Sequence, residues 1–255
     1  MSKETMTNRT HLYAYTAEER PASDQSMGFP QPPFTVYKGE NPRIDLPADN
    51  IKEVITCNDL YKIMVNRKSS RLYEQDSLSL KELSYLLWMT QGVKDIAGVA
   101  HRVTLRNVPS AGARHALETY VFVNRVEGVE PGCYHYLPQT HELELISQDE
   151  QQIQKLSAAF CGQTFFGGSA VAFVWTAVPY RMEWRYGTMA EKLILLDAGH
   201  VCQNLYLAAA SIGCGVCAIG AYEQDKADEL LGLLQTRGDE RNEEIVVYAA
   251  SVGKK

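Results

Sequence analysis

Apolar residues recur at the spacing of an α-helix in two long segments of the chain. In the first, Ser79 and Glu82 have the spacing of a capping box, leucines follow every three or four residues, and Gly92 ends the pattern. The second segment, residues 188–212, is apolar on more than one face. We therefore predict two helices, of which the second is buried, and we expect His200 within it to be a hydrogen-bonded core residue.

Shorter helices are expected at three further places. Asp59 can cap a helix that ends just before Arg67, a polar helix is centred on residues 151–160, and Asp225 can cap an amphipathic helix that continues through Leu234. The first of these helices places a basic sequence directly after its last turn.

Runs of β-branched and aromatic residues predict strands between the helices. The run "LETYVFV" at residues 117–123 is followed by "CYHYL" and, across a turn, by "ELELI", which together have the alternation of paired strands. The unbroken apolar run "SAVAFVWTAV" at residues 169–178 is typical of a central strand buried on both faces. "EEIVVYAASV" is the predicted closing strand, and residues 214–222 are interpreted as a loop.

The first 50 residues differ in character from the rest of the chain. They are rich in proline, serine, threonine and charge, and the prolines disfavour both helices and interior strands. We interpret residues 1–50 as an extended or disordered N-terminal arm, either a tail or a strap around a partner subunit. Residues 51–255 then form the folded domain.

Composition and charge limit the classes of function. With 255 residues, of which 45% are hydrophobic, the chain has the composition of an ordinary globular protein. Its net charge of -6 and pI of about 5.6 provide no basic field for a nucleic acid. No stretch approaches ~18 consecutive apolar residues, and the six cysteines occur without a secretory signal. We therefore expect a soluble cytoplasmic protein with reduced thiols, and neither a nucleic acid nor a membrane as partner.

The first candidate site is a basic cluster, Arg67, Lys68, Ser69 and Arg71, directly after the first short helix. Three fixed cations with adjacent hydroxyls suit a phosphate monoester, because a dianion needs both opposite charge and several directed donors. Taken alone, such a cluster is more often a solvated surface turn. It becomes informative only when it is paired with other clusters.

Small residues form a second cluster between the capped helix and the first strand: Pro109, Ser110, Ala111 and Gly112. Such residues let the backbone approach a flat ligand closely, so that main-chain amides and the Ser110 hydroxyl can bond to ring heteroatoms. The alternative is a tight turn. The cluster contains no P-loop or dinucleotide-binding glycine fingerprint, so a Rossmann-type nucleotide site is not indicated.

The third cluster follows the long helix and contains Gly215, Val216, Cys217, Ile219 and Gly220. Its glycines would expose main-chain amides beside apolar side chains, which is a surface that can cover a flat ring. The sequence "CGVC" also forms a C-x-x-C pattern. No second pair stands at metal-site spacing, and the cysteines follow a helix instead of preceding one. We therefore discount a redox or zinc role and predict no metal site.

Taken together, the three clusters resemble the nitroreductase superfamily over residues 58–253. Arg67, Ser69 and Arg71 match its leading R-x-S-x-R signature. The sequences "PSAGARHALETYV", "GCYHY" and "LLDAGHVCQNLYLAAASIGCG" are similar to the branch that contains the azoline dehydrogenases of thiazole and oxazole biosynthesis. Singly these motifs are loose, but jointly and at this spacing they are specific.

The resemblance implies an α+β fold that binds flavin mononucleotide (FMN). In this family a mixed sheet is sandwiched by helices, and a long helix, here residues 188–212, forms a homodimer interface with two FMN molecules between the subunits. The resemblance assigns the FMN phosphate and ribityl chain to the first cluster, the isoalloxazine ring to the second, and the ring edge near N5 to the third.

The implied activity is an oxidoreduction with ping-pong kinetics. NADH or NADPH reduces the flavin and leaves, and a small organic acceptor, such as a nitroaromatic, a quinone or an enone, is then reduced. One alternative is an azoline dehydrogenase that oxidises peptide thiazolines or oxazolines to azoles. Another is a non-catalytic flavin-binding subunit that holds a partner through its N-terminal arm.

Two positions depart from the family pattern. Many members have Asn where this chain has Ala113, so the amide contact to the flavin pyrimidine is missing. The azoline dehydrogenases have a Lys-Tyr pair before the long helix, where this chain has Arg185 and Tyr186. Arginine stays protonated, so Arg185 cannot replace a lysine base. Tyr186 can act as an acid or base, provided that its surroundings lower the ordinary tyrosine pKa of about 10. We therefore take Arg185 and Tyr186 as the candidate catalytic residues and a general oxidoreductase as the leading hypothesis.

Overall fold

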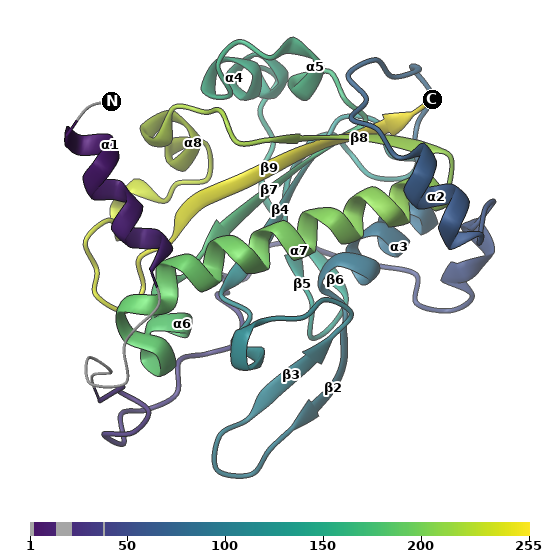
Figure 1. The fold of residues 1–255 in the computed structure, drawn as a ribbon. Helices are drawn as coiled ribbons and strands as arrows, with labels where there is room; N and C mark the ends of the chain where they lie inside the picture. The colour runs from purple at the N-terminus through teal and green to yellow at the C-terminus, as the bar shows by residue number, and fades with distance from the viewer. Residues whose placement is uncertain (1–2, 14–21, 38) are drawn as a thin grey trace.

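The computed structural model describes residues 3–13, 22–37 and 39–255. Its centre is a seven-stranded sheet with the strand order β1-β6-β5-β4-β7-β9-β8, in which neighbouring strands are antiparallel. A separate hairpin projects from the body of the molecule (Figure 1). The strands of the sheet are β1 (Arg43–Asp45), β4 (Leu117–Val123), β5 (Gly132–Leu137), β6 (Glu142–Ser147), β7 (Val171–Ala177), β8 (Cys214–Ile219) and β9 (Ile245–Lys254). Those of the hairpin are β2 (Val93–Ala97) and β3 (Val103–Arg106).

Helices cover both faces of the sheet (Figure 1), which confirms the predicted α+β fold. One face packs against α3 and α7, and the other against α4, α5 and α8. The α-helices are α1 (Lys3–Thr7), α2 (Leu60–Asn66), α3 (Leu80–Gln91), α4 (Gln152–Ala159), α5 (Thr164–Gly167), α6 (Pro179–Tyr186), α7 (Ala190–Ser211) and α8 (Gln224–Leu230). Short 3-10 turns lie at Asn8–Leu12, Ile51–Val54, Ala111–Ala113, Gly187–Met189 and Leu234–Thr236.

The strand and helix signals read from the sequence agree with most of these elements. Strand β7 is buried along its whole length between β4 and β9, as its unbroken apolar run predicts. Ser79 and Glu82 form the complete capping box at the start of α3. The side chain of Asp59 accepts a hydrogen bond from the Lys62 amide at the start of α2. Local sequence therefore determines the helix starts that precede and follow the basic cluster.

Four segments differ from the sequence-based expectation. Residues 214–219, interpreted as a loop, form the edge strand β8, because β9 supplies a hydrogen-bonded partner along the whole segment despite the glycine at position 215. The helix expected through Leu234 ends at Leu230, and Gly232 follows with a φ of 67°. Helix α6 and the β2–β3 hairpin were not predicted, although Pro179 in the first turn of α6 and the amphipathic pattern of this helix were available signals.

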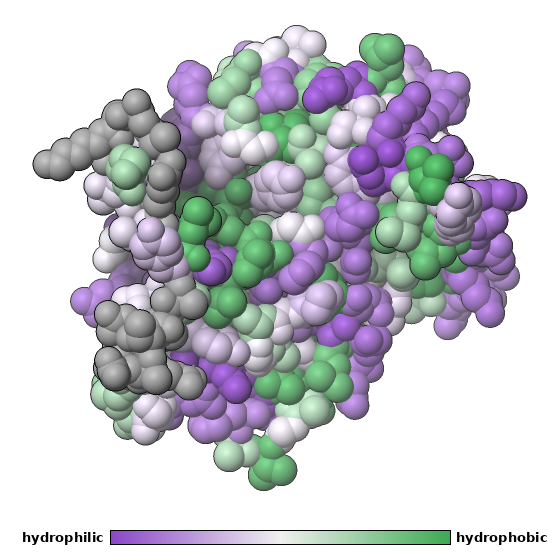
Figure 2. Space-filling model, viewed as in Figure 1, coloured by the Kyte–Doolittle hydropathy of each residue, from purple (hydrophilic) through white to green (hydrophobic). Residues whose placement is uncertain are grey.

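Helix α7 is only partly buried. Leu195 and Leu196 are 57% and 51% exposed, and Figure 2 shows apolar surface over this part of the helix. His200 is also exposed, so the prediction of a core histidine was wrong: the apolar stripe wraps around α7, but the sheet covers only one side of it. By length and composition alone, residues 179–211 could cross a membrane, yet half of their most apolar window is buried in this fold. The core helix of a soluble protein has the same property.

Several parts of the N-terminal segment contact the rest of the domain. Strand β1 pairs with β6, and the amide of Gln25 donates to the carbonyl of Trp184 in α6. The parts of the predicted arm at residues 1–2, 14–21 and 38 lie outside the described residues. The domain boundary at residue 50 stays a prediction.

Candidate functional site

The first and third clusters lie side by side in the folded chain. The amide of Ser70 donates to the carbonyl of Val216 at 2.8 Å, and Ser69 pairs with Val216 as a parallel bridge at the edge of β8. The approach is close because Gly215 has no side chain: a Cβ there would lie 2.7 Å from Ser70 Cβ and 2.8 Å from Lys255 Cε. Residues separated by more than 140 positions therefore form one surface.

Tyr206 of α7 contacts both clusters and holds them together. Its hydroxyl accepts a hydrogen bond from the Ala218 amide at 2.9 Å and lies 2.9 Å from Ser69 Oγ, to which it can donate its own proton. The Arg67 guanidinium lies over the Tyr206 ring, 5.0 Å from its centroid. One phenol thus orders both clusters at the second half of α7.

A cavity of about 250 Å³ opens where these segments meet. Four cationic side chains line it, together with the amide side chain of Asn66 and the small residues at the start of β8. Cations and directed donors around a cavity of this size fit a phosphate monoester with its attached chain. The cations are Lys62, Arg67, Lys68 and Lys255.

Only some predicted residues of these clusters line the cavity. Arg67, Lys68 and Val216 do, whereas the Arg71 guanidinium lies over the ring of Phe165, 5.7 Å from its centroid. Ile219 is buried in the core on the opposite face of the sheet, and Gly220 is exposed beyond the end of β8. Cys217 is buried in β8, next to the bridge to Ser69.

Lys62 and Lys255 were missed because neither lies within a cluster. Lys62 lies within α2, and Lys255 is the last residue of the chain, where sequence alone gives no sign that a strand end returns to the basic cluster. Tyr206 was missed because it reads as one more apolar position of the long helix. A tyrosine on a buried stripe, with a hydroxyl that needs a partner, was the available signal.

The second cluster lies at the other half of α7. Ala111 donates its amide hydrogen to Asp197 Oδ1 at 3.3 Å, and Ser110 Oγ accepts from the His115 amide at 2.9 Å. Burial raises the pKa of Asp197. Asp197 and Tyr206 are nine residues apart, which corresponds to about 13 Å along a helix axis. Within one chain, the second cluster is therefore not brought to the phosphate-type cavity.

Arg185 and Tyr186 do lie beside the second cluster. Gly112 has a φ of 56°, and a Cβ on it would lie 2.5 Å from Tyr186 Oη and 3.1 Å from Arg185 Nε. Glycine at this position therefore serves two purposes: it tolerates the left-handed backbone, and it leaves room for the two side chains. The Arg185 guanidinium also lies 5.6 Å from the centroid of the Tyr186 ring.

Cations dominate the surroundings of this second cluster. Burial, followed by the charge of Arg185, lowers the pKa of Arg114. Burial and the nearby Arg106 guanidinium lower the pKa of His115 to about 2, so its imidazole is neutral at physiological pH. A neighbourhood with Arg106, Arg114 and Arg185 favours negative charge on a bound ring or substrate.

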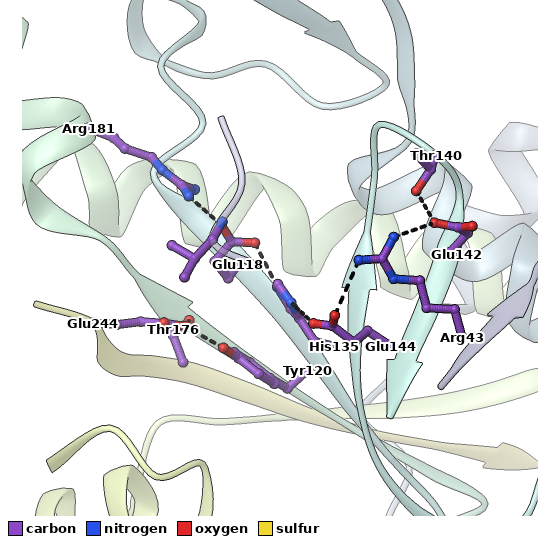
Figure 3. A network of polar contacts seen from close by, with 11 residues as sticks. Arg43, Glu118, Tyr120, His135, Thr140, Glu142, Glu144, Thr176, Arg181 and Glu244 are labelled. Carbon is purple, nitrogen blue, oxygen red and sulfur yellow. Dashed lines mark hydrogen bonds and ion pairs between the residues drawn. The ribbon is translucent and has the colours of Figure 1, made fainter. Parts of the chain in front are cut away.

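A buried polar network beneath α6 was also missed by sequence reasoning (Figure 3). Glu118 of β4 accepts a hydrogen bond from Nη2 of Arg181 in α6 and lies 2.8 Å from His135 Nε2. Despite its burial, these partners lower the pKa of Glu118 to about 2, with Arg181 the largest favourable influence. The network continues to Glu144 and to Arg43 of β1. It connects the sheet to the helix that carries Arg185 and Tyr186.

The two cysteines of the C-x-x-C pattern are separated by three positions of β8. Side chains alternate along a strand, so Cys214 and Cys217 point to opposite faces and are not placed as a redox pair. Burial raises the pKa of Cys214 to about 12 and also raises that of Cys217, which keeps both thiols protonated. In the described part of the chain, no three His, Cys, Asp or Glu side chains form a group able to hold a metal ion.

Two curated relatives match the chain over most of its length. The Methanocaldococcus jannaschii protein MJ1384, which carries the name nitroreductase, is 35% identical over 193 residues, or 76% of this chain and 91% of its own. The trifolitoxin-processing protein TfxB of Rhizobium leguminosarum bv. trifolii is 28% identical over 189 residues, or 71% of this chain. The match spans only 50% of TfxB.

Solved structures show the same fold. A nitroreductase-type protein of Ralstonia eutropha superposes with a TM-score of 0.64 at 26% identity, over 89% of this chain and 94% of that one. A chain of the Escherichia coli microcin synthetase complex superposes with a TM-score of 0.58 at 18% identity, over 100% of this chain and 94% of that one. Residues 64–254 match the sequence description of the nitroreductase family. The chain therefore belongs to the nitroreductase family.

Proposed function

We propose that this protein is an FMN-dependent oxidoreductase that uses NADH or NADPH to reduce a small organic acceptor. Members of its family are generally flavin-dependent oxidoreductases. The observation that carries the proposal is the cavity with four cations between α2, α7 and β8, whose donor set suits the FMN phosphate. When bound, FMN supplies the hydride and electron transfer that protein side chains cannot perform.

The residues of the cavity would bind the phosphate end of the cofactor. Arg67 offers a planar guanidinium held over Tyr206, whereas Lys68, Lys62 and Lys255 offer point charges from three different segments. Gly215 keeps the edge of β8 free of side-chain atoms next to them. Of the predicted first cluster, Ser69 orders the loop through its hydrogen bond to Tyr206, whereas Arg71 lies over Phe165 outside the cavity.

A complete site requires a second copy of the chain. The ring-binding loop at residues 109–112 and the phosphate cavity lie at opposite halves of α7, and large apolar side chains of α2 and α7 are exposed (Figure 2). A two-fold axis perpendicular to α7 would bring the loop of one copy to the cavity of the other. The exposed side chains are Leu60, Tyr61, Met64 and Val65 of α2 and Leu195 and Leu196 of α7. A monomer in light scattering that retains FMN would contradict this homodimer.

Arg185 and Tyr186 are the residues proposed to meet the acceptor. Arg185 stays protonated and can hold an anionic or electron-rich group, but it cannot remove a proton. Tyr186 can hold or move a proton at its Oη, which packs directly on Gly112 beside Arg185. These two groups suit a nitroaromatic, a quinone or an enone better than a substrate that must lose a proton to a lysine base.

An azoline dehydrogenase acting on peptides is the second candidate, and the similarity to TfxB favours it. It requires a base, which Arg185 does not provide. Arg185→Lys is the discriminating variant: azole formation from a heterocyclised peptide by either form would support this candidate, and none by both would reject it.

The most direct test of the proposed function is an absorbance spectrum during anaerobic titration with NADH and NADPH. The proposal expects a yellow protein whose flavin bleaches and whose absorbance returns on addition of nitrofurazone. A colourless protein that binds no FMN would contradict it. Flavin that stays oxidised under excess reductant would instead support the third candidate, a non-catalytic flavin-binding subunit in the cytoplasm.

A further inference from the structure

A segment before the family-matched region contacts the helix that presents the candidate catalytic pair. Residues 24–36 precede the matched residues 64–254, yet they run along α6 and bond to it. The Gln25 amide donates to the carbonyl of Trp184 at 2.8 Å, and the Trp184 indole donates to the carbonyl of Phe29 at 3.0 Å. Trp184 immediately precedes Arg185 and Tyr186.

Trp184 joins this segment to the rest of the second cluster. Its ring is fully buried and meets His101 of the β2–β3 hairpin edge to face, with 5.3 Å between centroids. On the same indole lies the Arg114 guanidinium, 5.3 Å from the ring centroid. Gln31 donates its side-chain amide to the carbonyl of Arg102, at the base of the hairpin. Three separate segments therefore meet on one residue.

Two further contacts fix α6 along its length. The Tyr180 hydroxyl donates to Asp24 Oδ2 at 2.8 Å, and the Arg241 guanidinium lies over the rings of both Tyr180 and Phe29.

Arg181, the next residue of α6 after Tyr180, bonds to Glu118 (Figure 3). Glu118 also accepts a hydrogen bond from the Val36 amide at 3.0 Å. The segment therefore bonds to α6 directly through Asp24, Gln25 and Phe29, and indirectly through Val36, which shares Glu118 with Arg181.

We propose that residues 24–36 are a positioning element that sets the orientation of α6 and, through it, the place of Tyr186 on Gly112. Helix α6 has only eight residues, which is too short to be stable without tertiary contacts. Its last residue, Tyr186, lies so close to Gly112 that even a Cβ at that position would clash with the Tyr186 hydroxyl. A shift of about 1 Å in a catalytic group can reduce a rate by about 100-fold, so the anchors of α6 control the reaction. This inference rests on the proposed function.

Trp184→Phe tests the element, with Trp175→Phe as its matched control. Both indoles are fully buried, but within the described chain the Trp175 Nε1 has no hydrogen-bond partner, whereas that of Trp184 bonds to Phe29. Both changes remove similar volume. We expect the reaction of NADH-reduced enzyme with nitrofurazone to slow by about 5- to 50-fold in the Trp184 variant only. FMN affinity should stay within about 2-fold of wild type in both.

A second readout does not depend on flavin. Amide hydrogen exchange of residues 179–188 should accelerate at least about 5-fold in Trp184→Phe and stay unchanged in Trp175→Phe. Equal exchange and equal rates in the two variants would overturn the inference. A wild-type protein that binds no FMN would instead contradict the proposed function, and the exchange comparison would still decide whether the segment orders α6.

A second pair of variants, Tyr180→Phe and Tyr222→Phe, tests the same inference if the tryptophan variants misfold. Each change removes one hydroxyl hydrogen bond, to Asp24 in the segment and to the carbonyl of Val246 in the sheet, respectively. We expect a slower oxidative reaction, by about 3-fold or more, and faster exchange in α6 for Tyr180→Phe alone. The same result for both tyrosines would contradict a specific role of the N-terminal segment.

Discussion

Replacement of Gly112 by alanine should displace the Tyr186 hydroxyl. Beyond the strain of a side chain at this left-handed backbone position, the loss of stability should be small. The backbone at Gly112 has a φ of 56°, where a side chain costs about 1 to 2 kcal/mol. The new Cβ would lie 2.5 Å from Tyr186 Oη, so the hydroxyl must move by about 0.9 Å to reach an ordinary contact of 3.4 Å. Because Oη is the end of a rotatable side chain, it can yield without unfolding the loop. A shift of this size should reduce turnover by about 10- to 100-fold.

Gly128→Ala is the matched control for this variant. Gly128 also has a positive φ, of 75°, but no atom lies within 4 Å of the position of a new Cβ. Urea unfolding should give similar losses for the two variants, about 1 to 2 kcal/mol each, whereas steady-state reduction of nitrofurazone should fall only in Gly112→Ala. Undiminished turnover in Gly112→Ala would refute the assignment of Tyr186 to the reacting pocket. A loss of turnover equal to that of Gly128→Ala would show that backbone strain alone is responsible.

Four further outcomes follow from the structure. Gly215→Ala should weaken FMN binding by about 10-fold in fluorescence titration, because its Cβ would meet Ser70 and Lys255, and an unchanged affinity would count against this edge of the site. Lys255→Met should weaken binding of FMN by about 10-fold and leave that of riboflavin unchanged. Tyr206→Phe should lower the free energy of unfolding by about 1 to 2 kcal/mol, since it removes the hydroxyl that bonds to two clusters. The pKa of His115 is about 2 in the folded chain, compared with 6.5 for an ordinary histidine, so below pH 6.5 the unfolded chain binds a proton that the folded chain does not. Stability should therefore fall as the pH decreases below 6.5, by up to about 1.4 kcal/mol per pH unit, and His115→Gln should flatten this slope.

Elements with a strong local signal could be predicted from the sequence. The capping box of α3 and the continuous apolar run of β7 each leave one favourable conformation, whatever the rest of the chain does. Strand β8 contains Gly215 and follows Gly213, which suggests a loop, and its pairing with β9 is what makes it a strand. Helix α6 likewise depends on anchors from β4 and the N-terminal segment. A short stretch of sequence does not show which distant segments will pack against it.

The sequence predicted which types of residue form the candidate site, but not how these residues are arranged in space. Arg67 and Lys68 were identifiable because phosphate chemistry calls for clustered cations. Lys255 and Asp197 were not, because their roles come from the return of β9 to the basic cluster and from the packing of α7 under the loop at residues 109–112. The distance between the two halves of the site also follows from the length of α7, which the sequence predicted without showing what lies at either end.

The central claim is that the cavity between α2, α7 and β8 binds the phosphate of FMN. Titration of the flavin-free protein with FMN and with riboflavin, followed by flavin fluorescence, tests it most directly. The four cations predict a Kd for FMN below about 1 µM and an affinity for riboflavin at least about 100-fold weaker. Equal affinities for the two flavins, or no binding of either, would contradict the claim.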